Sequence, residues 1–162
     1  MDNKDSEFLK RIQATFRIEA LEHLKSFSRG LIELEKTQTK EILAGIIETM
    51  FREVHSLKGA ARSVGQKEIE LVCQPLESLF AAMKKKEITL TPATFDLFYK
   101  TIDLLSKIVS TDGSEQAPTA KQNLKVLLQQ LKQIVPVTKN DDFREVHAQQ
   151  QAIIPVESLP FV

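Results

Sequence analysis

Apolar residues recur every three or four positions along most of this chain, and this period is what most constrains its fold. Such spacing is typical of helices that bury one face and expose the other. The first predicted helix runs from Glu7 to about Lys36. Gly30, near its end, is tolerated at a cost of about 1 kcal/mol. The predicted buried face consists of Phe8, Ile12, Phe16, Ala20, Leu24, Phe27, Leu31 and Leu34.

Two further helices are predicted in the middle of the chain. The second runs from about Lys40 to Val64, after a break at 37–39 that offers a threonine N-cap, and Gly65 suits the left-handed position that ends it. The third runs from about Lys67 to Lys86, and because the connection between them is short, these helices should be antiparallel neighbours. Their inward residues are Leu43, Ile47, Met50, Val54, Leu57, Ala61 and Val64, then Ile69, Val72, Leu76, Leu79 and Met83.

The last two predicted helices have clear start signals. Thr91-Pro92 gives the fourth helix a capping threonine and a proline at its first position. A loop at 112–118 separates it from the fifth, for which Thr119 and Gln122 form a capping box and which Pro136 ends. Their stripes are Phe95, Phe98, Ile102, Leu105 and Ile108, then Leu124, Leu127 or Leu128, Leu131 and Ile134. We predict an all-α, up-and-down bundle over residues 1–135, with a four-helix core and a fifth C-terminal helix.

The helical pattern fades over residues 136–162. This stretch is polar, and then ends in apolar residues interrupted by Pro155 and Pro160. We interpret it as a linker or tail without a core of its own, leading to further domains in a longer parent protein. The start of a next domain, or a docking peptide, is the alternative.

The composition excludes several classes of function. Lys plus Arg and Asp plus Glu number 22 each, so the net charge is zero and gives no indication of a nucleic-acid partner. The single cysteine, Cys73, allows no internal disulfide and fits a reducing compartment; we expect a semi-buried apolar residue and not a redox switch. The first residues lack the apolar core of a signal peptide, and no run approaches the roughly 18 apolar residues that span a bilayer. We therefore expect a cytoplasmic protein without a membrane partner.

One histidine lies beside the buried stripe of the second helix and not within it. At about 100° per residue, His55 is well over a quarter-turn from the middle of that stripe. Arg52, Gly59 and Arg62 share its side, and Gly59 has no side chain to cover the ring. If the hairpin turns about position 66, Glu77 on the third helix lies level with His55. The spacing therefore predicts a carboxylate within reach of an accessible imidazole.

The motif His55-Ser-Leu-Lys58-Gly59-Ala60, with Gly65 ten positions after the histidine, resembles the core motif of the histidine phosphotransfer domain. The longer run from Phe16 to Leu79 resembles the N-terminal domain of chemotaxis-type and hybrid histidine kinases. In those kinases a glutamate at this spacing is the hydrogen-bonding partner of the histidine. The resemblance implies that His55 accepts a phosphoryl group from ATP held by a separate kinase domain and passes it to an aspartate of a response-regulator receiver.

The residues around His55 have predicted roles in this chemistry. Glu77 would accept a hydrogen bond from Nδ1–H and leave Nε2 as the nucleophile. Lys58 would contact phosphoryl oxygens, and Gly59 would let a partner approach. Arg52 and Arg62 are either further anion contacts or a solvated face.

Two positions depart from the resemblance. Gln74 stands where chemotaxis-type kinases often have a second histidine, and it cannot titrate. Pro75 interrupts the third helix, so we predict a kink near Leu71–Pro75 that leaves Glu77 aimed at His55.

Other functions fit the sequence less well. A helical docking module that has lost transfer is the alternative, and a self-contained hydrolase has no nucleophile–base–orienter set. His23 and His147 are interpreted as plain residues, and neither has metal-ligand spacing, so no metal is predicted. The chain lacks a glycine-rich phosphate loop, so we expect no cofactor on this domain; ATP and Mg²⁺ belong to the partner kinase or receiver. The domain itself is predicted to be monomeric.

Overall fold

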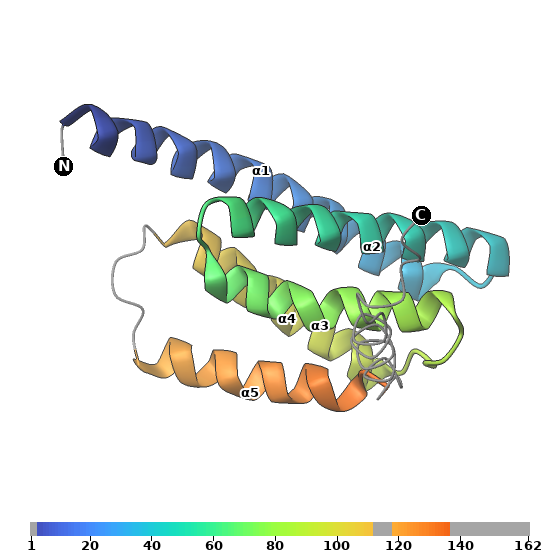
Figure 1. Ribbon diagram of the computed structural model, residues 1–162. Helices are drawn as coiled ribbons and strands as arrows, with labels where there is room; N and C mark the ends of the chain where they lie inside the picture. The colour runs from blue at the N-terminus through green and yellow to red at the C-terminus, as the bar shows by residue number, and fades with distance from the viewer. Residues whose placement is uncertain (1–2, 112–117, 137–162) are drawn as a thin grey trace, which may run out of the picture.

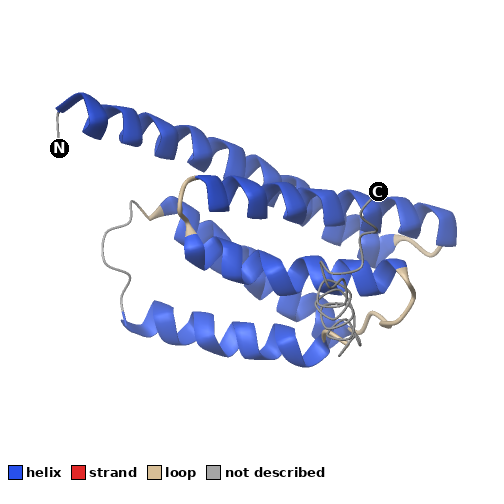
Figure 2. Ribbon diagram, viewed as in Figure 1, coloured by secondary structure: helices blue, strands red, loops and turns tan. Residues whose placement is uncertain are grey.

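The computed structural model describes residues 3–111 and 118–136, and the regular elements within these ranges are helices (Figures 1 and 2). They are α1 (Asn3–Lys36), α2 (Lys40–Ser63), α3 (Lys67–Lys84), α4 (Pro92–Ser110) and α5 (Pro118–Ile134). The all-α class is confirmed. The predicted loop at 112–118 and tail at 136–162 lie almost entirely outside the described residues, so the role of the tail and the boundary near residue 135 stay predictions.

Helices α1 to α4 form the core of the bundle. Helix α2 lies between α1 and α3, and α4 packs against both α1 and α3 to close the ring. Helix α5 lies outside this ring, along α3 and α4 (Figure 1). Successive helices run in opposite directions, so the up-and-down bundle with a fifth helix is confirmed.

Aromatic rings join three of these helices at the centre of the core. The fully buried ring of Phe80 in α3 meets Phe27 of α1 edge-on at 5.4 Å and stacks on Phe98 of α4 at 5.3 Å. Both separations lie in the range where aromatic pairs attract each other beyond the effect of buried area. These ring contacts fix the buried side of α3 against α1 and α4.

The start of α1 corrects one prediction about the core. The side chain of Phe8 is 64% exposed, and Ile12 is only partly buried. Helix α1 has 34 residues and α2 has 24, so at 1.5 Å per residue α1 is about 15 Å longer. Its N-terminal turns extend past the other helices (Figure 1), and within the described part of the chain this end of the apolar face is left uncovered.

Several helix ends also differ from the predictions. Helix α1 begins at Asn3, α2 ends one residue early with Val64 as its C-cap, and α3 ends at Lys84. Helix α5 begins at Pro118, so Thr119 lies inside its first turn and is not its cap. Proline suits that position because its φ is already helical and it has no N–H to satisfy. Besides Ile12, the residues of the predicted stripes that are only partly buried include Leu43, Ile47, Val64, Phe95 and Ile134.

The turn between α2 and α3 sets the register of the functional face. Gly65 has a φ of +74°, a left-handed conformation that glycine adopts without a steric penalty. The Gln66 amide donates to the Ala61 carbonyl at 2.8 Å, and the Gly65 amide donates to Arg62 at 3.2 Å. These two bonds define a Schellman motif, which ends a helix at a fixed position. The predicted glycine C′ position and the antiparallel hairpin are both confirmed.

Other predicted signals can be compared with the same coordinates. Thr91 caps α4, because its hydroxyl accepts from the Thr94 amide at 3.2 Å. Thr39 is the N-cap residue of α2, although its side chain makes no capping bond. Helix α3 continues through the buried Pro75. The angle of the predicted kink stays a prediction, but Glu77 does point towards His55.

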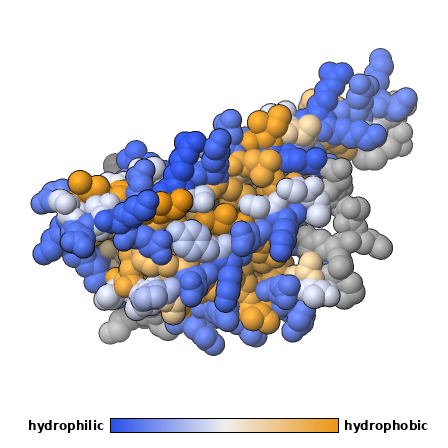
Figure 3. Space-filling model, turned by 180° about the vertical axis from the view of Figure 1, so that it is seen from behind, coloured by the Kyte–Doolittle hydropathy of each residue, from blue (hydrophilic) through white to orange (hydrophobic). Residues whose placement is uncertain are grey.

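The surface carries mostly hydrophilic side chains. Seen from behind, apolar atoms appear between them in separate patches and narrow strips (Figure 3). Within residues 3–111 and 118–136, no helix is both long enough and apolar enough to cross a membrane.

Candidate functional site

The imidazole of His55 and the carboxylate of Glu77 meet across the α2–α3 hairpin. Nδ1 of His55 lies 3.0 Å from Oε1 of Glu77. The two residues stand eleven positions before and after Gln66, as the hairpin register predicts. The His55 side chain is 63% exposed, whereas that of Glu77 is 19% exposed. The acid is thus held within the bundle while the ring reaches solvent.

Lys58 approaches the same carboxylate from one turn further along α2. Its Nζ forms an ion pair with Oε2 of Glu77, so the two oxygens of the acid serve two different partners. The Lys58 side chain is only 20% exposed. The structure therefore places the ammonium on Glu77. Its predicted contact with a phosphoryl group stays a prediction, and would require the ammonium to leave or share this carboxylate.

These contacts determine the charge of Glu77. Burial alone would raise the pKa of Glu77, but hydrogen bonds from Lys58 and His55, together with their charges, outweigh it and hold the pKa of this carboxyl below its usual range. The acid is consequently ionised at neutral pH. An ionised carboxylate can only accept, so in the neutral form of His55 the proton lies on Nδ1 and Nε2 carries the free lone pair.

The two arginines near His55 are engaged by other acids. The Arg52 Nε donates to Glu48 at 3.2 Å within α2, and the Arg62 guanidinium contacts Glu70 of α3 at 2.6 Å. Both arginine side chains are largely exposed. The structure does not bring either guanidinium onto His55, and an anion-binding role for them stays a prediction.

Gly59 and Gln74 lie on the two helices that carry the site. Gly59 is exposed, and a Cβ atom added there would meet nothing within 4 Å. The surface one turn after His55 is therefore open. Gln74 is also exposed and lines a shallow hollow between α3 and α5, together with Leu71 and Pro75. Gln74 thus lies beside α5, and a role for it at the His55 site stays a prediction.

Three of the polar contacts that join α2 to α3 recur at regular intervals. They are Arg62–Glu70, His55–Glu77 and Glu48–Lys84, each seven residues from the next on both helices. Seven residues are about two helical turns, so the three pairs fall along one seam. This seam fixes the register of the hairpin at the surface, as the Schellman turn does at its end.

A second histidine–glutamate pair was not anticipated. His23 of α1 was predicted to be a plain residue, but its Nδ1 lies 2.6 Å from Oε2 of Glu53 in α2, and its Nε2 lies 3.6 Å from Glu19. The His23 side chain is 21% exposed. The signal was available: His23 and Glu53 stand fifteen positions before and after Gln38, in the α1–α2 connection. His147, the other predicted plain histidine, lies outside the described residues.

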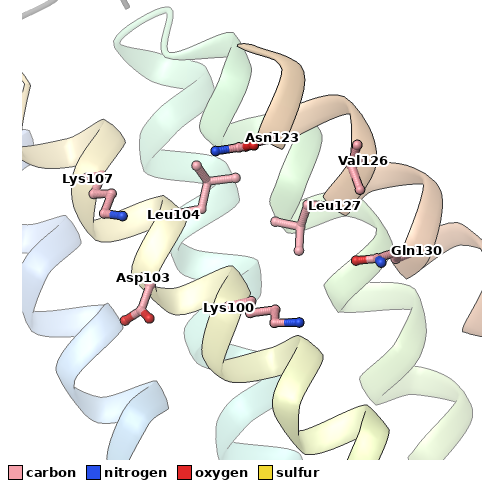
Figure 4. A pocket seen from close by; sticks show the side chains of 8 residues that line it. All are labelled: Lys100, Asp103, Leu104, Lys107, Asn123, Val126, Leu127 and Gln130. Carbon is pink, nitrogen blue, oxygen red and sulfur yellow. The ribbon is translucent and has the colours of Figure 1, made fainter. Parts of the chain in front are cut away.

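Three other possible kinds of site were a reactive cysteine, a ligand pocket and a metal centre. Cys73 is fully buried, and burial raises the pKa of its thiol to about 12, so the thiol stays protonated. A hollow of about 380 Å³ lies between α4 and α5, and its lining side chains come from these two helices (Figure 4). Its lining is Lys100, Asp103, Leu104, Lys107, Asn123, Val126, Leu127 and Gln130. Within the described ranges, no group of three His, Cys, Asp or Glu side chains is placed to hold a metal ion.

Comparison with known proteins identifies the family. The Hpt domain profile matches residues 11–134, which is most of the chain and all of the α2–α3 site. This chain belongs to the Hpt domain family.

Individual relatives agree with this assignment. The chain is 26% identical to the sensor histidine kinase CheAY of Helicobacter pylori over 117 residues, which are 71% of this chain and 14% of that protein. It is 27% identical to the chemotaxis protein CheA of Klebsiella aerogenes over 128 residues, 79% of this chain and 19% of that protein. The chain thus spans less than a fifth of the length of either relative.

Proposed function

We propose that this chain is a histidine phosphotransfer domain of a two-component phosphorelay, with His55 as the phosphoryl carrier. One observation carries the proposal: an exposed imidazole whose Nδ1 is held at 3.0 Å by a largely buried, ionised carboxylate, which leaves Nε2 as the outward nucleophile. The Hpt family membership and the similarity to a sensor histidine kinase and to a chemotaxis protein support the same chemistry.

The transfer can be written on these atoms. The Nε2 lone pair attacks the γ-phosphorus of ATP bound by a kinase domain, the bond to the bridging oxygen breaks, and ADP leaves with that electron pair. The ring then carries the phosphoryl group on Nε2 and a proton on Nδ1, so it is positively charged, and Glu77 stabilises this charge. In the second transfer a receiver aspartate oxygen attacks phosphorus. The N–P bond breaks, and its electron pair returns to Nε2.

The partners follow from this chemistry. A kinase catalytic domain supplies the phosphoryl group, and a response-regulator receiver accepts it; both would have to approach the exposed α2–α3 face. Gly59 supports this arrangement, because the surface beside His55 is open there. ATP and Mg²⁺ would be held by the partners, and this domain contributes the carrier histidine and its orienting acid.

The proposal can be tested with a small donor and a protein donor. The chain, His55→Gln and His23→Gln are incubated with phosphoramidate, and separately with labelled ATP, Mg²⁺ and the kinase domain of a chemotaxis kinase. We expect acid-labile, alkali-stable label on the wild type and on His23→Gln, and none at this site in His55→Gln. Equal label on all three proteins would overturn His55 as the carrier, and no label on the wild type with either donor would favour a docking module without transfer.

A further inference from the structure

A half-buried aromatic ring lies against the reactive imidazole. Phe51, one turn before His55 on α2, has its ring centroid 6.2 Å from that of His55, and the two planes differ by only 15°. This is the geometry of an offset stack. Phe51 is partly buried and also packs against the hydrophobic core, so the bundle restrains its ring.

Lys84 holds the same ring in place from α3. Its Nζ lies 4.8 Å from the Phe51 centroid, within the range of a cation–π interaction. The ammonium also forms an ion pair with Glu48. Glu48 precedes Phe51 by about one turn, and His55 follows it by about one turn. Lys84 is therefore anchored on the side of Phe51 that is away from the histidine.

We propose that Phe51, fixed by Lys84, is a positioning residue for phosphoryl transfer at His55. The inference rests on the proposed function and deepens it. Glu77 defines the direction of Nδ1, but a single hydrogen bond leaves an imidazole that is 63% exposed free to tilt about that bond. The flat face of Phe51 defines the plane of the ring. The two contacts together aim Nε2 outward.

The predicted consequence is a larger fraction of His55 in the reactive orientation. Leucine at position 51 would keep an apolar contact with the core but offer no flat face, so the ring would sample other orientations. An aromatic contact of this kind corresponds to about a three- to tenfold change in population. Tyrosine would retain the face. Lys84→Met would have a smaller effect, about twofold, because the stack itself remains.

The experiment measures phosphorylation of His55 by phosphoramidate, a donor too small to depend on a docking surface. Phe51→Leu, Phe51→Tyr and Lys84→Met are compared with the wild type. Phe95→Leu serves as the matched control, because Phe95 is also a half-buried phenylalanine on the core but lies on α4. Thermal unfolding of each variant is followed by circular dichroism. The ¹⁵N shifts of Nδ1 and Nε2 report the tautomer of His55.

We expect Phe51→Leu to react about three- to tenfold more slowly, Phe51→Tyr to restore the rate, and Phe95→Leu to match the wild type. The ¹⁵N shifts of the two ring nitrogens in Phe51→Leu should move towards each other. Equal rates and shifts for the wild type and Phe51→Leu would overturn the positioning role. Failure of the wild type itself to take up phosphoryl on His55 would instead overturn the proposed function, so the two failures are distinguishable.

Discussion

Within residues 3–111 and 118–136, two histidine–glutamate pairs of the same chemical type lie in very different settings. In the α2–α3 pair, His55 is 63% exposed, and the second oxygen of its acid is occupied by Lys58. In the α1–α2 pair, His23 is 21% exposed, and a second acid, Glu19, lies 3.6 Å from its Nε2. Under the proposed function, contact with a carboxylate is therefore not enough to make a phosphoryl site. The free nitrogen must also face solvent, and no anion must stand where the phosphoryl oxygens would be.

Removing the acid from each pair gives the sharpest test of this contrast. Glu77→Ala should slow phosphorylation of His55 about ten- to a hundredfold, because the imidazole loses the group that fixes its tautomer and stabilises its charge. Glu53→Ala should leave the rate unchanged and lower the free energy of unfolding by about 1–2 kcal/mol, because a partly buried link between α1 and α2 is lost. Phosphoramidate kinetics and urea unfolding measure the two effects. A slower reaction in Glu53→Ala would show that the pairs are not functionally separate.

Access to His55 can be tested on two matched glycines of α2. Gly45 and Gly59 are both exposed, and an added Cβ has open space at each, so either change to alanine should stabilise the helix by about 0.5–1 kcal/mol. Only Gly59→Ala should slow transfer from a kinase domain, by about fivefold, the equivalent of about 1 kcal/mol of overpacking at the interface. Transfer from phosphoramidate should not change. Equal rates for both variants with the protein donor would remove Gly59 from the docking face.

The smallest expected effect is on stability at low pH. The pKa of Glu77 is lower in the folded protein than its ordinary value of 4.5, so the ionised acid stabilises the fold above that pH. This contribution is lost as the pH falls through the lowered pKa. The stability of the wild type relative to Glu77→Gln should therefore decrease from about pH 6 to about pH 3 in urea unfolding. A constant difference over that range would mean that Glu77 gains nothing from Lys58 and His55.

The sequence predicted the helices and the meeting of His55 with Glu77 well, because both depend on regular spacing. Helical period gives the buried faces, and a short connection with Gly65 gives the register of a hairpin. The same reasoning applied to the α1–α2 connection would have paired His23 with Glu53. No motif marks that part of α1, so the sequence alone does not single out this pair.

Other features could not be read from spacing. Phe8 has the correct period for burial, but period does not tell whether a neighbouring helix is long enough to cover it. Whether Lys58 contacts Glu77 or a phosphoryl group depends on its side-chain conformation and burial, which the sequence does not specify. The stack of Phe51 on His55 likewise depends on ring orientation and not only on their four-residue separation.

The ion pair between Lys58 and Glu77 affects how stable the phosphorylated form of His55 would be. A relay must hold a phosphoryl group long enough to meet the next protein, yet release it readily. Because the Lys58 ammonium is already paired with Glu77, it can stabilise the phosphoryl group on His55 only to a limited extent. We therefore expect phosphorylated His55 to be a high-energy form from which the phosphoryl group is readily transferred.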